Sequence, residues 1–375
     1  MYDYIRQDNI YIVLYVAYTT TVIIGSLYLL FRRGNAFDAT ITTPVRLRRW
    51  TAAFFVCNAL GHLWYMQILF HDSSEEILMT DIIGTLFDAM TVFPMALVIL
   101  LTMLQDRRRP LWPIAAVMLP LVVASIVCLV VRSYVYLPFI HVYLVSMCIG
   151  IAISMARALR QYARWLRDNY ADLEHKEVWQ TFVVVAFVLI SFALYEYVII
   201  GPLYQYAILA LNMVLACYLL WRVETLSDLS LPAGETATTE SKDEDVKDNV
   251  LSQANQESIR SLLQQHCIDT KLYLQHDLTL LQLARIIGTN RFYLSQYFAC
   301  QGTTYNAYIN DLRLEHFIHL HHEAAAEKQA LSAQKLAYAS GFRSYNTFSS
   351  AFKRKTGMSV TAWMKENSNT YRFSL

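Results

Sequence analysis

Residues 279–298 are TLLQLARIIGTNRFYLSQYF, and residues 332–352 are SAQKLAYASGFRSYNTFSSAF. The two stretches share one plan: a hydroxyl residue, three residues, Leu-Ala, three residues and a glycine. Thr279 and Gly288 bound this plan in the first copy, and Ser332 and Gly341 bound it in the second. A repeat at one constant offset indicates two copies of one structural unit.

Each copy predicts two short helices joined by a tight turn. Thr279 and Ser332 are suited to cap a helix with their side-chain oxygen, and Gln282 at the third helical position completes a capping box in the first copy. Gly288 and Gly341 stand where a helix ends and a positive φ is needed. The Leu-Ala pair leaves room for a second helix to approach closely.

The second helix of each copy carries two apolar residues four positions apart, which is the spacing of a buried helical face. These residues are Leu294 and Phe298 in the first copy, and Phe348 and Phe352 in the second. A capped helix, a glycine turn and a second amphipathic helix make a helix-turn-helix, whose second helix enters the major groove of DNA.

The stretch between the copies, residues 304–322, predicts one long linking helix. Its sequence is TYNAYINDLRLEHFIHLHH, with apolar residues near helical spacing at Tyr305, Ile309, Leu312, Leu314 and Phe317.

Residues from about 255 to 367 resemble the DNA-binding domain of AraC-type transcription regulators. The resemblance rests on the paired motifs and on residues 341–363, GFRSYNTFSSAFKRKTGMSVTAW, which are close to the second-motif signature of that family. It covers under a third of the chain. It implies that two helix-turn-helix units contact successive major-groove faces on one side of double-stranded DNA.

The resemblance also implies which residues read bases. These are Phe292, Ser295 and Gln296 in the first recognition helix, and Asn346, Thr347, Ser349 and Ser350 in the second. Gln and Asn pair well with adenine, and Phe can touch a thymine methyl. Gln296 and Ser350 stand where the family often has arginine, so strong guanine contacts are missing. Val360 stands where proline is usual.

Basic residues near both motifs are expected to contact phosphates and position the domain without reading sequence. They are Arg291, Arg343, Lys353, Arg354 and Lys355. A solvated helix face is the alternative for each of them. Arg313 in the linking helix matches a family position that we expect to make structural contacts.

The composition of the whole chain predicts a membrane region outside this domain. Of its 375 residues, 55% are hydrophobic and 16% are charged. Seven apolar runs approach the length of about 20 residues that crosses a bilayer as a helix. They lie near residues 10–31, 50–70, 83–104, 111–131, 139–156, 178–199 and 203–221. The expected fold class is all-α, with a polytopic helical membrane bundle followed by the two-motif domain.

Lysine and arginine stay on the cytoplasmic side of a membrane, so their loops give the orientation. We expect the N-terminus outside and the C-terminal domain in the cytoplasm of a bacterial cell, with the bundle in its cytoplasmic (inner) membrane. One set of loops carries Arg6 and Arg132; the other carries Arg32, Arg33, Arg46, Arg48, Arg49, Arg107, Arg108, Arg109, Arg157, Arg160, Arg164, Arg167 and Lys176.

A change of composition separates the two parts. We expect residues 1–222 to form the membrane region, 223–250 an acidic flexible linker and 251–370 the DNA-binding domain. Residues 224–248 lose large apolar side chains and gather acidic ones, as solvated tethers do. A loop packed on the next domain is the alternative. From residue 270 onward basic residues outnumber acidic ones, which suits a polyanionic partner.

Ionisable residues inside spans invite a functional hypothesis. Asp88, His141 and Glu196 fall in the outer third of their expected helices and are candidates for a ligand pocket; interhelical pairing or snorkelling is the alternative. Six cysteines without a CxxC pair predict neither a disulfide framework nor a zinc site. The histidines at 316, 319, 321 and 322 have no supporting ligands nearby, so we expect no metal site.

The sequence therefore predicts a membrane-bound, one-component transcription regulator. No catalytic motif is present, so we expect neither an enzyme nor a cofactor. Expected partners are double-stranded DNA, membrane lipid, an unknown signal ligand and a second copy of the chain. The alternative is a membrane receptor or transporter whose C-terminal helices bind a protein. Proteolytic release of the domain at the linker is a third hypothesis.

Overall fold

The computed structural model describes residues 8–37, 41–71, 73–133, 137–184, 186, 202–229, 253–327 and 332–372. Most of these residues are helical and none forms a β-strand, which confirms the all-α class; an isolated antiparallel bridge joins Tyr170 to Thr279. The chain divides into two compact units. The first comprises residues 1–162 and 175–230, and the second comprises residues 163–174 and 231–375.

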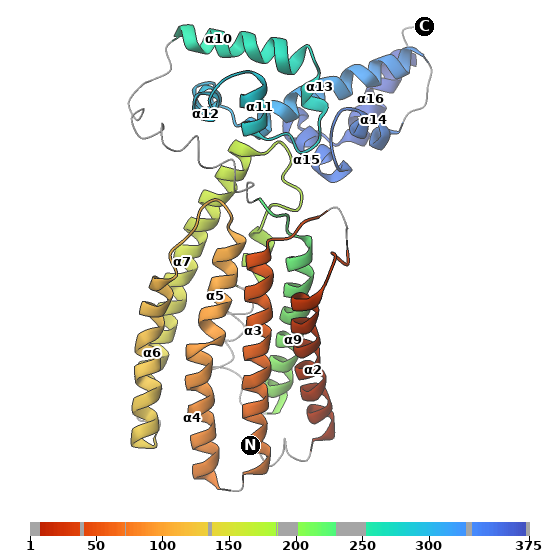
Figure 1. The fold of residues 1–375 in the computed structure, drawn as a ribbon. Helices are drawn as coiled ribbons and strands as arrows, with labels where there is room; N and C mark the ends of the chain where they lie inside the picture. Colours follow the sequence, from red (N-terminus) through yellow and green to blue (C-terminus); the bar gives the residue numbers. More distant parts are fainter. Residues whose placement is uncertain are drawn as a thin grey trace. The chain divides into compact units, whose positions relative to one another are not determined.

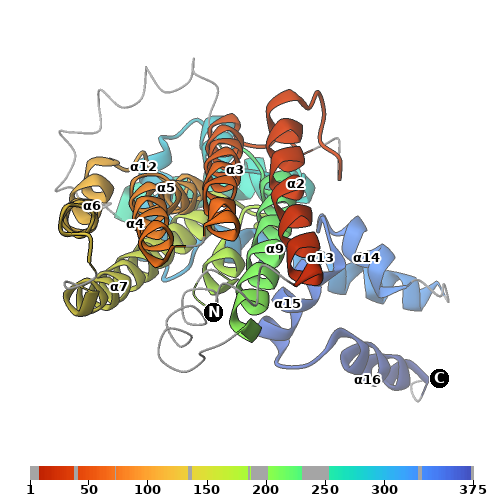
Figure 2. The ribbon, with the colours of Figure 1, turned by 90° about the horizontal axis from the view of Figure 1, so that it is seen from below.

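The first unit is a bundle of long helices. Figures 1 and 2 show α2, α3 and α9 grouped together, with α4 to α7 continuing the bundle. The elements are α2 (Asn9–Phe31), α3 (Val45–Tyr65), η1 (Met66–Phe70), α4 (Ser74–Met90), α5 (Val92–Met103), α6 (Trp112–Val131), α7 (Leu137–Asn169) and α9 (Pro202–Thr225).

The expected span 83–104 is interrupted. Helix α4 ends at Met90 and α5 begins at Val92, with Thr91 between them at φ −126° and ψ −66°. Pro94 lies in the first turn of α5 and has no N–H to donate to the carbonyl of Met90, four residues earlier. A proline therefore explains why the helix breaks here.

Five described helical stretches are long and apolar enough to cross a membrane, judged by length and composition. They are Asn9–Phe31, Ser74–Met103, Trp112–Val131, Val142–Asn169 and Tyr206–Thr225, which correspond to five of the seven expected spans. The expected span 50–70 forms α3 and η1, which are not among the five; Arg46, Arg48 and Arg49 occupy the first turns of α3. The expected span 178–199 lies mostly outside the described residues.

Polar side chains hold the chain where it leaves α9. Arg32 donates to the buried carboxylate of Glu224 and to the hydroxyl of Thr43. Gln105 donates its amide to the carbonyl of Ser227 over 2.9 Å, and its oxygen accepts the Leu229 N–H over 2.8 Å. The start of the expected linker is thus packed on the first unit, and residues 230–252 lie outside the described residues.

The second unit is built from short helices around one long helix. They are α10 (Gln253–Leu263), η3 (Gln264–Ile268), η4 (Leu272–Leu274), α11 (Leu280–Ile286), α12 (Arg291–Cys300), α13 (Tyr305–Ala326), α14 (Ala333–Ala339), α15 (Tyr345–Thr356) and α16 (Val360–Arg372). Helix α13 is the predicted linking helix.

Helix α13 contributes to two hydrophobic cores. Its first half places Tyr305 and Ile309 in a core formed with α10, α11 and α12. Its second half places Leu314 and Phe317 in a core formed with α14, α15 and α16. Each helix-turn-helix therefore has its own core, and both cores share one helix.

Candidate DNA interface

The first motif has the predicted caps. Thr279 accepts the backbone N–H of Gln282 over 3.2 Å, and the Gln282 side chain accepts the N–H of Thr279 over 2.9 Å. The capping box is confirmed. Gly288 follows at φ +72°, and the Asn290 side chain then caps α12 by accepting the Phe292 N–H over 2.8 Å. Residues 287–290 thus form a short turn that connects α11 to α12.

The second motif repeats this construction with a turn that is one residue longer. Ser332 accepts the Lys335 N–H and Ser344 accepts the Thr347 N–H, each over 3.3 Å, so both helices are capped. Gly341 has φ +90°, and a Cβ at this position would lie 2.7 Å from the Leu274 Cα. Glycine is required here for both its backbone conformation and its lack of a side chain.

The predicted buried stripes of both recognition helices are confirmed. Leu294 and Phe298 of α12 are at most 2% exposed, and Phe348 and Phe352 of α15 are fully buried. The opposite faces of α12 and α15 consequently point away from the cores.

Polar contacts join the two motifs. Arg313 of α13 is 1% exposed and donates to the carbonyls of Tyr273 and Gln275, each over 2.8 Å. The expected structural role of this arginine is therefore confirmed. Burial lowers the pKa of the Arg313 guanidinium, and the nearby Asp172 carboxylate opposes that shift. His276 Nδ1 also lies 3.1 Å from the Gly341 carbonyl oxygen.

The residues predicted to read bases differ in exposure. Phe292 of α12 is 39% exposed, and Asn346 and Ser350 of α15 are also exposed. Thr347 contacts the Ser344 hydroxyl over 3.0 Å, so its side chain supports the cap of α15. The half-buried residues of the set are Ser295, Gln296, Thr347 and Ser349.

The residues predicted to contact phosphates are largely engaged within the chain. Arg291 Nε donates to Asn169 Oδ1 over 3.0 Å. Arg343 pairs with Asp277 over 2.7 Å and so bridges the motifs. Lys355 pairs with Glu315 of α13 over 3.1 Å. Lys353 and Arg354 are exposed and form no ion pair with a described residue.

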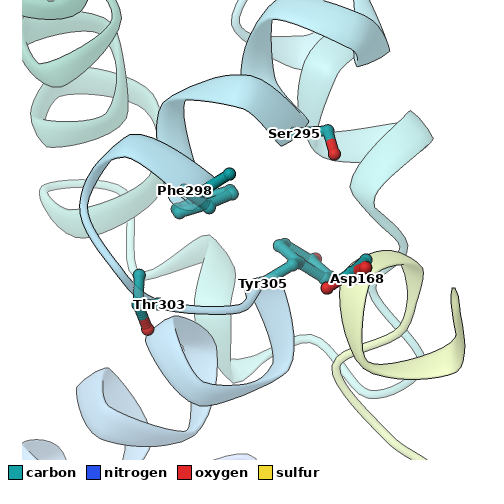
Figure 3. A pocket seen from close by; sticks show the side chains of 6 residues that line it. Asp168, Ser295, Phe298, Thr303 and Tyr305 are labelled. Carbon is teal, nitrogen blue, oxygen red and sulfur yellow. The ribbon is translucent and has the colours of Figure 1, made fainter. Parts of the chain in front are cut away.

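The structure adds a segment that the sequence did not connect with the motifs. Ala171 is fully buried in the first core, and the Asn306 side chain donates to its carbonyl over 2.7 Å. Asp168 and Ser295 line one small cavity of about 70 Å³ (Figure 3). The sequence signal for this partner was the pair Asn306 and Asn310, which lie four residues apart in the linking helix. Both side chains are buried in the structure.

The expected membrane ligand set is described in part. Asp88 Oδ2 accepts the Tyr65 hydroxyl over 3.0 Å, and a Cβ at Gly61 would lie 3.3 Å from Asp88 Oδ1. Asp88 therefore packs against α3. The His141 side chain and all of Glu196 lie outside the described residues.

Comparison with known proteins agrees with this geometry. Residues 283–366 match a family model described as a helix-turn-helix domain, which covers less than a quarter of the chain. Neither a curated protein nor a solved structure matches the chain. The matched residues run from α11 to α16 and include both recognition helices. Residues 283–366 are therefore an AraC-type helix-turn-helix domain, the DNA-binding part of a transcription regulator.

Proposed function

We propose that this chain is a membrane-bound, one-component transcription regulator, in which a signal received by the membrane region changes how the C-terminal domain binds DNA. One observation carries the proposal: a two-motif DNA-binding domain and five helical stretches of membrane length occur in the same chain. The proposal needs no second protein to carry the signal.

We propose that the faces of α12 and α15 that point away from their cores contact the DNA bases. The proposed base contacts are made by Phe292, Ser295, Gln296, Asn346, Thr347, Ser349 and Ser350. The exposed side chain of Asn346 supports a bidentate contact to adenine. Lys353 and Arg354, exposed at the end of α15, supply phosphate contacts, whereas Arg343 and Lys355 must first leave their carboxylate partners.

The membrane assignment rests on apolar surface. Val130 of α6 is 77% exposed and Phe31 of α2 is 76% exposed, which suits hydrocarbon and not water. Residues 1–222 form the proposed membrane region, with the N-terminus outside and basic loops in the cytoplasm. Asp88, His141 and Glu196 are the proposed ligand-facing residues.

Full-length protein in lipid nanodiscs tests the DNA part of this function. A duplex selected from a randomised pool should bind wild type with an affinity that falls steeply with salt, because phosphate contacts release counterions. The Gln296→Ala, Asn346→Ala double variant should lose selectivity and keep background binding. Cell fractionation tests the membrane part, which is wrong if the chain is found in the soluble fraction.

A protein-binding role for the C-terminal domain is the second candidate. It is favoured by the engagement of Arg291, Arg343 and Lys355 within the chain, which reduces the positive charge available to phosphates. An apolar protein interface would show weak salt dependence. If the protein binds no duplex at any salt concentration, the protein-binding role is therefore favoured.

A further inference from the structure

Residues 168–172 are part of the second unit and lie against its first helix-turn-helix. Tyr170 forms an antiparallel bridge with Thr279, the N-cap of α11. The Ala171 N–H donates to the Leu278 carbonyl over 3.2 Å, and Asn306 donates to the Ala171 carbonyl. The segment 168–172 is thus docked by backbone hydrogen bonds at the start of α11 and by a side chain of α13.

The same segment reaches the first recognition helix. Asn169 accepts a hydrogen bond from Arg291, a predicted phosphate contact, and Asp168 shares a cavity with Ser295, a predicted base contact (Figure 3). Arg291 and Ser295 are four residues apart and therefore lie on one side of α12. The segment covers the edge of the surface assigned to DNA.

The Asp168 charge opposes DNA binding, although the neighbouring Arg164 and Arg167 offset part of it. A recognition helix in the major groove is flanked by phosphates, and the Asp168 carboxylate lines the same small cavity as Ser295 of that helix. Arg291 meanwhile donates to an amide oxygen of its own chain. The Asp168 carboxylate repels phosphates, and Asn169 engages the Arg291 guanidinium that would bind them.

One buried polar atom of the docked segment lacks a hydrogen-bond partner in the part of the chain that the structure describes. Asp172 is 2% exposed, and its Oδ2 has no hydrogen-bond partner among the described residues. A buried carboxylate oxygen without a donor is unfavourable, whereas the attraction between the Asp172 carboxylate and Arg313 favours the docked state. Residues 163–169 are also the last turns of α7, a single 33-residue helix whose apolar part belongs to the first unit. A change in that helix reaches the segment through the chain itself.

We propose that residues 168–172 compete with DNA for the first helix-turn-helix, and that they leave α12 when this motif binds DNA. The docked chain binds DNA weakly through this motif, and the released chain binds it strongly. This inference rests on the proposed function, and it identifies residues 168–172 as the element that regulates DNA binding.

The test uses full-length protein in nanodiscs and a duplex selected from a randomised pool with wild type and variants together. The Asp168→Asn, Asn169→Ala double variant should tighten DNA binding at least about fivefold, the lower range of coupling between two sites. Glu323→Gln on α13 removes the same single charge away from α12 and should change affinity less than about twofold. Arg291→Ala should weaken binding, because it removes the phosphate contact as well.

Hydrogen exchange of the wild type gives a second measurement that does not depend on variants. Added duplex should slow exchange in residues 291–300 and speed it in residues 168–174. Unchanged affinity in the double variant, or slower exchange in residues 168–174 with DNA bound, overturns the inference while leaving the proposed function intact. Failure of wild type and every variant to bind any duplex contradicts the proposed function itself.

Discussion

The side-chain amide of Asn306 donates to the backbone carbonyl of Ala171 over 2.7 Å, across 135 residues of chain. The Asn306 oxygen accepts in turn from Asn310 over 3.2 Å. A loop between two expected spans and the linking helix of the DNA-binding domain therefore share one buried hydrogen-bond network.

Replacing Asn306 with alanine should destabilise the first helix-turn-helix. The change leaves a buried carbonyl and the Asn310 amide without partners, which costs about 1–3 kcal/mol for each unsatisfied group. Hydrogen exchange of residues 278–305 in the full-length protein measures this loss. Asn346→Ala on the exposed face of α15 is the matched control, and equal effects of the two changes would contradict the network.

A fragment of residues 251–375 should be less stable than the same domain in the whole chain, because it lacks Ala171 from the first core. It should nevertheless bind DNA more tightly, since it also lacks Asp168 and Asn169. Urea unfolding and duplex titration measure the two effects separately. A fragment with wild-type stability would show that residue 171 is dispensable to the core.

Two glycine substitutions should differ in cost. Gly288→Ala places a side chain at φ +72° in open space, so its cost is backbone strain of about 1–2 kcal/mol. Gly341→Ala adds a contact of 2.7 Å with the Leu274 backbone at φ +90° and should cost clearly more. Thermal unfolding of both variants gives the comparison. A smaller loss for Gly341→Ala would mean that η4 moves aside freely.

The second motif should lose stability in mild acid. Burial lowers the pKa of the His321 imidazole, and His322 adds to this effect. The folded state thus binds a proton less readily than the unfolded state, whose pKa is about 6.5. Stability is full above that pH and falls as pH drops through it. His321→Gln should flatten the pH dependence of exchange in α13 and α16, whereas His319→Gln, 65% exposed, should not.

Asn346 and Lys353 should have separable roles on α15. Asn346→Ala should relax the preference at one base pair and cost about 1–3 kcal/mol on the selected duplex. Lys353→Ala should weaken binding to all duplexes alike and reduce the salt slope by about 1. Affinities for matched and mismatched duplexes at several salt concentrations distinguish the two. Identical behaviour of the variants would remove the base contact from Asn346.

The local architecture of the motifs could be predicted because short-range chemistry determines it. Thr279, Gln282 and Gly288 act within ten residues of one another, and the spacing of Phe348 and Phe352 alone marks a buried face. The arrangement of long apolar helices followed by a helix-turn-helix domain could be predicted from hydrophobic length and from the repeat.

Long-range pairing could not be predicted in the same way. Arg343 and Asp277 are 66 residues apart, and nothing in the type of either residue distinguishes an ion pair from a phosphate contact. Asn169 is the last residue of α7 and Ala171 lies in the short stretch after it, so no periodic pattern in the sequence predicted their place beside the first motif. The break at Thr91, in contrast, has a local signal in the sequence, because Pro94 lies three residues later.

Helix α13 also restricts the operator. Its 22 residues rise about 1.5 Å each, which makes it roughly 33 Å long, close to the 34 Å of one turn of B-DNA. Both motifs build their cores on this helix, and Arg313 and the Arg343–Asp277 pair brace them further. Under the proposed function, the two contacted segments of an operator should therefore have one preferred separation. Inserting a single base pair between them turns one segment by about a tenth of a helical turn and should weaken the contacts of one motif.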